Sequence, residues 1–211
     1  MIFSMLFQEP MMFVAWLLAI FYGITIHEFA HAWAASWQGD DTAKLLGRLT
    51  LNPFAHVDFM GLLMLAFVGF GWGKPVPVNP ANLKNGKKSD TLVSLAGIFF
   101  NLVSIIIFTL ILKALIMTGN FGQGNLLINF LFMLIMINLV LAIFNLIPIP
   151  PLDGSHVLFN ILPAKYDDFK LKLAQNGPWI LLIVILADNF LNIGIFNFLF
   201  GFFLDLIYGI F

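Results

Sequence analysis

A run of apolar residues from about 11 to 37, long enough to cross a membrane, contains the segment His27-Glu28-Phe29-Ala30-His31. About 20 consecutive apolar residues span the hydrocarbon core as a helix. Ionisable side chains within such a helix are costly to bury, and they usually serve a function. The chain must therefore fold so that these polar side chains meet polar partners inside the membrane.

The composition is that of an integral membrane protein. Hydrophobic residues make up 61% of the 211 residues and charged residues only 10%, unlike the values of soluble domains. A net charge of −1, with no basic stripe, excludes the electrostatic footprint of a nucleic-acid-binding protein. The chain has no cysteine, so disulfides and thiolate metal sites are excluded. We therefore expect an all-α, polytopic helical bundle that forms one membrane domain over residues 1–211.

Apolar stretches predict where this bundle crosses the membrane. We expect spans at about 11–37, 91–117 and 126–147, and one or two more within 176–211. The apolar stretch that begins at Phe59 is too short to span comfortably as a helix. It leads to Pro75 and Pro77, whose spacing forbids a regular helix. Residues around 59–80 are therefore predicted to form a short re-entrant or extended β element.

Lysine and arginine are distributed unevenly between the predicted loops. The loops near Lys44, Lys84 and Lys165 all fall on one side of the membrane. The N-terminus and the turn at 119–125 fall on the other side and contain neither residue type. Because basic loops remain in the cytosol, we expect a multi-pass protein of the cell membrane with cytosolic basic loops and an external N-terminus.

The spacing of His27 and His31 favours a zinc site. Residues at i and i+4 lie on one face of a helix, so both imidazoles can reach one Zn²⁺. In an HExxH segment the intervening Glu28 can activate a water as a general base. The alternative interpretation is a pair of histidines that are hydrogen-bonded within a polar helix interface.

A catalytic zinc needs a third protein ligand and one open position. The candidate is Asp153, which follows Pro148, Pro150 and Pro151 at the end of the third span. Prolines leave backbone carbonyls unpaired, and such backbone is tolerated at membrane depth only beside protein or a water-filled cavity. The alternative is that Asp153 caps the helix that follows it.

Together the two motifs resemble those of the site-2 protease family, peptidase family M50, whose members are intramembrane zinc metalloproteases. The first motif is HExxH in an early span. The second has the pattern Asn-x-x-Pro-x-x-Pro-x-Asp-Gly and consists here of Asn145, Pro148, Pro151, Asp153 and Gly154. The resemblance covers about Phe21 to His156 and fits the short form that lacks a PDZ or CBS domain.

This resemblance implies a three-span catalytic core with one Zn²⁺ per chain. The ion would be bound by His27, His31 and Asp153, and Glu28 would be the base. Asn145 would hydrogen-bond the substrate carbonyl or the tetrahedral intermediate. Partners would be the lipid bilayer and membrane proteins whose transmembrane segments are the substrates.

Three other polar residues have more than one interpretation. His56 could be a substitute ligand, a gate or a substrate contact, or a loop histidine bonded to nearby backbone. His156 could support the site or act as a capping or interfacial residue. Asn101 could belong to the site or hydrogen-bond between helices. Relatives have a Gly-Pro pair before this asparagine, whereas this chain has Gly97-Ile98.

The function predicted from these residues is that of a zinc metalloendopeptidase for regulated intramembrane proteolysis. The extended run Lys74–Asn79 offers an edge to which an unwound substrate could add as a strand. A divalent-metal transporter is the main alternative, since intramembrane His and Asp also suit transport. A serine protease is disfavoured because no serine lies in a nucleophile elbow. A catalytically inactive scaffold is disfavoured because Glu28 is intact.

Overall fold

Long apolar helices dominate the computed structural model, which describes residues 6–68, 71–119, 124–191, 193–194, 198, 201–203, 205 and 209. Within this part of the chain, four helices are long and apolar enough to cross a membrane: Pro10–Trp37, Lys87–Met117, Leu126–Leu146 and Ala164–Asp188. The chain is therefore an all-α, multi-pass membrane protein.

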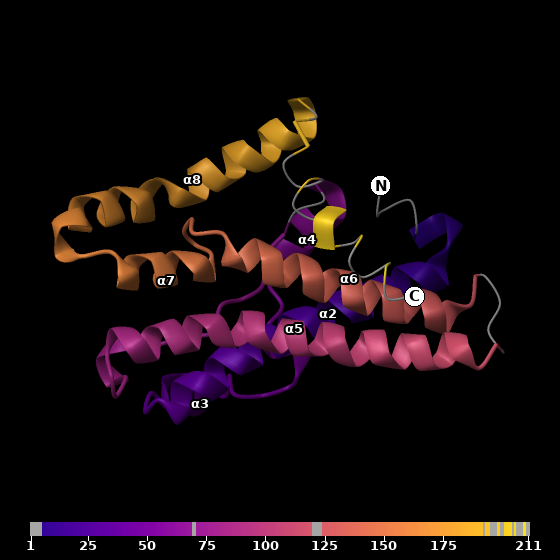
Figure 1. The fold of residues 1–211 in the computed structure, drawn as a ribbon, viewed down its shortest axis with the longest axis horizontal. Helices are drawn as coiled ribbons and strands as arrows, with labels where there is room; N and C mark the ends of the chain where they lie inside the picture. The colour runs from indigo at the N-terminus through magenta and orange to yellow at the C-terminus, as the bar shows by residue number, and fades with distance from the viewer. Residues whose placement is uncertain are drawn as a thin grey trace.

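Three helices, α2 (Pro10–Trp37), α5 (Lys87–Met117) and α6 (Leu126–Leu146), pack against one another at the centre of the bundle (Figure 1). All three contribute to one buried apolar cluster, formed by Ala19, Leu112, Leu131, Leu134, Ile135 and Leu139. The buried face of α2 consists largely of alanine and other small residues. Small residues let helix backbones approach closely, which drives helix association in lipid.

Local sequence signals set the ends of these helices. The side chain of Asn125 accepts hydrogen bonds from two backbone N–H groups and caps the start of α6. α6 ends at Leu146 because Pro148 follows two residues later and cannot continue a helix. α5 begins about one turn earlier than predicted, directly after Gly86, whose φ of 50° favours glycine.

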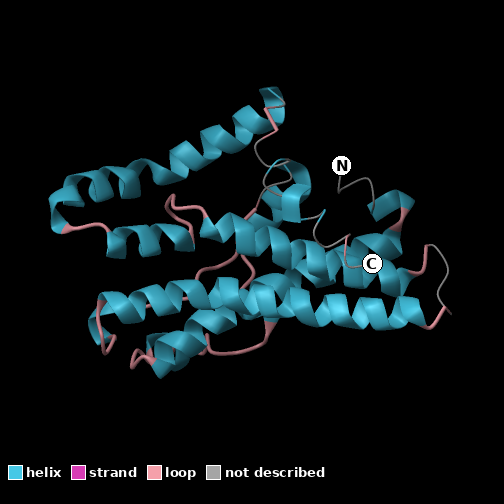
Figure 2. Cartoon of the chain, in the orientation of Figure 1, coloured by secondary structure: helices cyan, strands magenta, loops and turns pink. Residues whose placement is uncertain are grey.

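The segment between α2 and α5 is mostly loop, with the short helices α3 (Thr42–Leu45) and α4 (Phe59–Val68). Figure 2 shows helices joined by loops in this region. In the described residues, the expected β element is limited to one antiparallel bridge between Val57 and Gly73. α4 is helical because no proline precedes Pro75 in this stretch. Its re-entrant placement in the membrane stays a prediction.

Two helices follow the proline-rich turn at the end of α6. α7 (Asp153–Ile161) packs against α5, and α8 (Asp167–Leu191) includes Pro178 in its interior. α8 thus starts earlier than the predicted span and takes in the polar residues before it. The second span considered within 176–211 falls largely outside the described residues.

The basic loops lie at one end of the bundle. α3 and the beginnings of α5 and α8 lie at the left of Figure 1, and the beginning of α2, the end of α5 and the beginning of α6 lie toward the right. Lys44, Lys87 and Lys165 all belong to the left end. The lysines that the predicted topology assigns to one side of the membrane therefore lie at one end of the bundle.

Candidate metal centre

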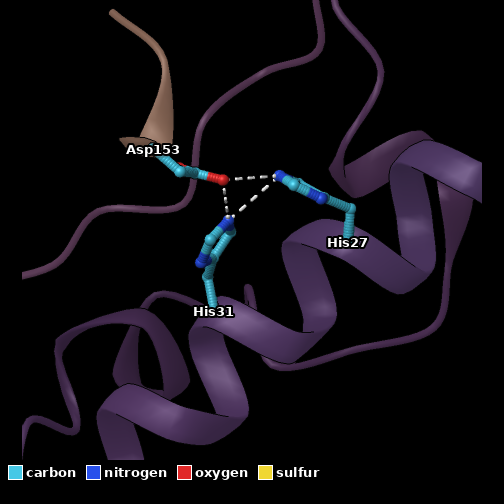
Figure 3. Close-up of side chains that lie close together, drawn as sticks. All are labelled: His27, His31 and Asp153. Atoms are coloured by element: carbon cyan, nitrogen blue, oxygen red, sulfur yellow. Dashed lines mark hydrogen bonds and ion pairs between the residues drawn. The ribbon is translucent and has the colours of Figure 1, made fainter. Parts of the chain in front are cut away.

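Three side chains from two separate helices converge in the bundle. His27 and His31 extend from one face of α2, and Asp153 comes from the first residue of α7 (Figure 3). The two histidine Nε2 atoms lie 3.1 Å apart. Asp153 Oδ2 lies 3.1 Å from Nε2 of His27 and 3.2 Å from Nε2 of His31. His27 and His31, spaced i and i+4 on α2, thus face Asp153, the carboxylate that the sequence predicts as the third ligand.

Hydrogen bonds determine which ring nitrogens carry protons. His31 Nδ1 lies 2.8 Å from the carbonyl oxygen of Val93, which can only accept, so Nδ1 is the donor. His27 Nδ1 lies 2.7 Å from Asn101 Oδ1 and donates to it in the same way. In the neutral imidazoles, both Nε2 atoms therefore present lone pairs toward Asp153.

This donor set fits a zinc ion. Three electron-pair donors at this range repel one another unless a metal cation or a proton lies among them. Asp153 Oδ2 is buried and accepts no hydrogen bond from the described residues. Zn–N and Zn–O bonds of about 2.0–2.1 Å imply a tetrahedral edge of about 3.3 Å, close to the three separations. An outer-sphere acceptor for each histidine is also a usual feature of zinc sites.

Asp153 does not cap α7. The residue lies at the first helical position, and no side chain provides a capping hydrogen bond at this end. Its carboxylate faces the two histidines instead (Figure 3). The geometry thus favours the ligand interpretation over the capping interpretation.

Glu28 lies beside the histidine pair, but its carboxylate is engaged elsewhere. The backbone N–H of Val76 donates to Glu28 Oε2 over 2.8 Å. Glu28 is half-buried and lines the same cavity as the three converging side chains. This cavity has a volume of about 650 Å³, and apolar residues such as Ile20, Leu65 and Phe144 form much of its wall.

Asn101 connects the candidate site to the rest of the bundle. Its Nδ2 donates to Gly23 O at 3.3 Å and to Asn138 Oδ1 at 2.8 Å, while its Oδ1 accepts from His27. Asn138 is oriented in turn by a 2.7 Å hydrogen bond to Leu134 O. Both asparagines are fully buried. Asn101 therefore hydrogen-bonds between three helices and accepts from His27, while its part in a metal site stays a prediction.

Sequence reasoning missed Asn138. Its position in the middle of an apolar span was an available signal, because polar residues at membrane depth need partners. Only the packing of α5 on α6 shows that its partner is Asn101. The residue thus supports His27 indirectly, through one intervening side chain.

Two glycines allow the helices to approach closely enough for this geometry. A β-carbon at Gly97 would lie 2.6 Å from both His27 Cε1 and His31 Nε2. A β-carbon at Gly154 would collide with the backbone carbonyl of Leu146, at 2.6 Å from its carbon. Gly97 therefore lets α5 pass the histidine rings, and Gly154 lets α7 start against the end of α6.

The other predicted site residues occupy different positions. Asn145 is half-buried in the cavity wall, and its Nδ2 donates to Leu141 O at 3.0 Å. His56 is fully buried and does not belong to the group formed by His27, His31 and Asp153. Its Nε2 lies 2.8 Å from Thr50 O, which agrees with the interpretation of a loop histidine bonded to the backbone. His156 also lines the cavity, 3.8 Å from Asp90, and this carboxylate raises the pKa of His156 above its usual value.

Comparison with known proteins identifies related sequences. Residues 113–185 match peptidase family M50. A Bacillus subtilis protein named as a zinc metalloprotease, YwhC, is 41% identical over 166 residues, which cover 76% of this chain and 74% of that protein. A Mycolicibacterium smegmatis protein with a similar name, Rip2, is 30% identical over 198 residues, which cover 89% of this chain and 71% of that protein. No solved structure matches significantly.

Gly97→Ala should weaken zinc binding, because the added methyl group would displace the histidine rings or α5. We expect a loss of about 10- to 100-fold in affinity, as for other disturbances around a metal ligand. Gly201→Ala is the matched control, since a β-carbon there meets nothing within 4 Å. Zinc titration of the purified proteins measures the difference, and equal affinities would show that the close approach of α5 is unimportant.

Asn101→Leu should also weaken zinc binding by about 10- to 100-fold, because His27 Nδ1 loses its acceptor and the ring loses its fixed orientation. Asn129→Leu makes the same change in α6, where the side chain donates a hydrogen bond to Met12 Sδ at 3.8 Å and none to a histidine among the described residues. The control should bind zinc normally. A similar loss in both variants would indicate a general effect of replacing intramembrane asparagine.

Proposed function

The chain belongs to peptidase family M50, the site-2 protease family, and on this basis we propose that it is an intramembrane zinc endopeptidase for regulated proteolysis. Its substrates are membrane proteins, cut within or beside a transmembrane segment. The convergence of His27, His31 and Asp153 next to Glu28 in an apolar cavity carries this proposal. Such a cavity suits an apolar peptide segment and restricts water to the neighbourhood of the polar groups.

One zinc ion per chain would be held by Nε2 of His27, Nε2 of His31 and the carboxylate of Asp153. When bound, the ion supplies Lewis-acid polarisation and lowers the pKa of a water toward neutrality. The chain's own contribution is to fix the ligand orientation through Asn101 and Val93 O, each of which accepts from one histidine.

Glu28 moves the proton in the proposed reaction. Its Oε1 has no hydrogen-bond partner among the described residues, whereas Oε2 is held by Val76. Oε1 therefore accepts the proton of the attacking water and later delivers it to the leaving amine. Asn145 donates from Nδ2 to the substrate carbonyl oxygen as negative charge develops there.

The substrate must unwind to reach these groups, because a helix shields its peptide bonds. Strand addition at Lys74–Asn79 stays a prediction, and the structure restricts how it can occur. Lys74 N–H donates to His56 O, and Val76 N–H to Glu28, while Pro75 and Pro77 have no N–H. The edge can therefore offer a substrate mainly carbonyl acceptors.

We propose that the basic end of the bundle is cytosolic and that the N-terminus is external, in the cell membrane. The positive-inside rule supports this orientation, since α3 and the beginnings of α5 and α8 bring lysines to one end (Figure 1). Asp90 and His156, which line the cavity, lie toward the same end. Water would therefore enter from the cytosol.

A metal transporter is less compatible with the site. Transport would require Glu28 among the ligands and a polar path to both faces of the membrane. Glu28 instead accepts from Val76, and the cavity wall formed by Ile20, Ile24 and Ile137 is apolar. These contacts favour hydrolysis over transport.

Glu28→Gln should abolish cleavage of a membrane-spanning peptide in lipid vesicles and leave zinc content unchanged, because the amide cannot take the proton and Glu28 is not a ligand. Asp153→Ala should abolish both cleavage and tight zinc binding, since it removes one of three ligands. Zinc analysis and peptide cleavage are measured on the same preparations. Loss of zinc in Glu28→Gln would favour the transporter.

Asn145→Ala should lower kcat by about 10²- to 10³-fold without loss of zinc, if Nδ2 donates to the developing oxyanion. Asn160→Ala is the matched control, because Asn160 bonds to Asp90 and Thr91 and does not line the cavity. A normal kcat in Asn145→Ala would indicate that Asn145 does not donate to the oxyanion and serves only through its hydrogen bond with Leu141 O at the end of α6.

A further inference from the structure

Residues 73–79, which we term the strap, pass over Glu28 and are tied down at their first residues. Gly73 pairs with Val57 in an antiparallel bridge. Lys74 N–H donates to His56 O over 2.7 Å, and Arg48 Nη2 donates to Lys74 O over 2.7 Å. Both backbone groups of Lys74 therefore have partners from the preceding loop.

The other end of the strap is fixed by Asp40. Asn79 N–H donates to Asp40 Oδ2 over 2.6 Å. Asp40 is fully buried and also accepts hydrogen bonds from Thr42 and Asn82. Burial alone would raise the pKa of Asp40, but these hydrogen bonds outweigh it and hold the pKa below its usual value. A charged, multiply bonded carboxylate thus anchors the strap.

Between these anchors, Val76 offers the only backbone N–H within 75–77, because both neighbours are proline. Proline also fixes φ on either side, which limits the directions in which the Val76 N–H can point. That N–H donates to Glu28 Oε2 over 2.8 Å. A rigid segment anchored at both ends therefore brings one hydrogen-bond donor to one carboxylate.

We propose that Val76 is a positioning residue, whose backbone N–H holds one oxygen of Glu28 so that the other is free to transfer protons. This inference rests on the proposed function. Glu28 is adjacent to His27 in sequence, and an unrestrained carboxylate could turn toward the metal or sample many rotamers. A hydrogen bond from a fixed backbone group removes that freedom before substrate arrives. The strap is thus part of the catalytic geometry in addition to forming a wall of the cavity.

Val76→Pro removes the donor and keeps an apolar residue in an extended run. We expect kcat to fall by about 10- to 100-fold, part of the 10²–10⁴ that a positioned base contributes. Zinc content should remain at the wild-type value, because the ligands are unchanged. KM should change less than kcat, because the Val76 N–H is bonded to Glu28 and is not available to the substrate. A purely structural role of the strap would alter KM or zinc content as much as kcat.

Val78→Pro is the matched control. It places a proline two residues further along the same strap, also after a proline, and removes an N–H that has no hydrogen-bond partner among the described residues. Val78 lies in the run proposed to receive the substrate and lines the cavity, so Val78→Pro should raise KM, whereas the fall in kcat is expected of Val76→Pro. Val76→Ala, which keeps the N–H, should restore kcat. An equal loss of kcat in Val78→Pro and Val76→Pro would overturn the proposal.

Amide hydrogen exchange tests the contact without an activity measurement. In zinc-free protein labelled with ¹⁵N-valine and ¹⁵N-lysine, the Val76 amide should exchange about 10- to 100-fold faster in Glu28→Ala than in the wild type, as expected for a lost hydrogen bond to a charged group. The Lys74 amide, which is bonded to His56 O, should be unaffected. This comparison tests the hydrogen bond between Val76 and Glu28 even if Val76→Pro fails to fold. An unchanged exchange rate of the Val76 amide in Glu28→Ala would refute the proposal.

The outcomes also separate this inference from the proposed function. An active Glu28→Gln would refute the proposed function itself. An inactive Glu28→Gln together with wild-type kcat in Val76→Pro would refute only the positioning role. A higher kcat in Val76→Pro would also refute it and would indicate that the strap restrains Glu28 as an inhibitory contact.

Discussion

The convergence of three electron-pair donors inside a membrane bundle is the constraint on which the rest of the structure depends. His27, His31 and Asp153 bring their donor atoms within 3.2 Å of one another. Without a cation or a proton among them, this arrangement brings the lone pairs of largely buried side chains against one another. The surrounding helices can maintain it because each histidine donates its other ring proton to a buried carbonyl oxygen. The site is therefore specified as much by its outer hydrogen bonds as by its ligands.

Close helix packing makes that arrangement possible. α5 can provide Val93 O and Asn101 to the histidines only because Gly97 has no side chain to strike the rings. α7 can present Asp153 because Gly154 passes against the end of α6, where the prolines have ended the helix. Lipid supplies no hydrophobic force between helices, so small residues and buried amides must supply the association. The same residues that hold the bundle together thus orient the proposed metal ligands.

The proposed cleavage of a membrane-spanning substrate calls for an apolar path beside a polar reaction centre. The cavity meets both requirements, with aliphatic walls and the Glu28 carboxylate among the lining groups. The strap links this cavity to the loop that follows α2, since Arg48 and Asp40 fix its two ends and Val76 reaches Glu28 between them. Backbone donors are well suited to such a position, because they have no rotamers of their own.

The sequence alone determined the membrane class, the approximate helical spans and the HExxH pair, and it made Asp153 a candidate ligand beside the alternative of a helix cap. These follow from local rules, since i and i+4 share a helical face and an apolar run of sufficient length must span. Tertiary structure alone decided the roles of Asn138, Gly97 and Val76. It also decided that α8 begins at Asp167, ahead of the apolar part of that helix. Asn138 and Gly97 act across a helix interface, whose register no single helix encodes. Val76 acts through a backbone N–H that every residue except proline carries, so its type gives no signal, and only the folded path of the strap brings that group to Glu28.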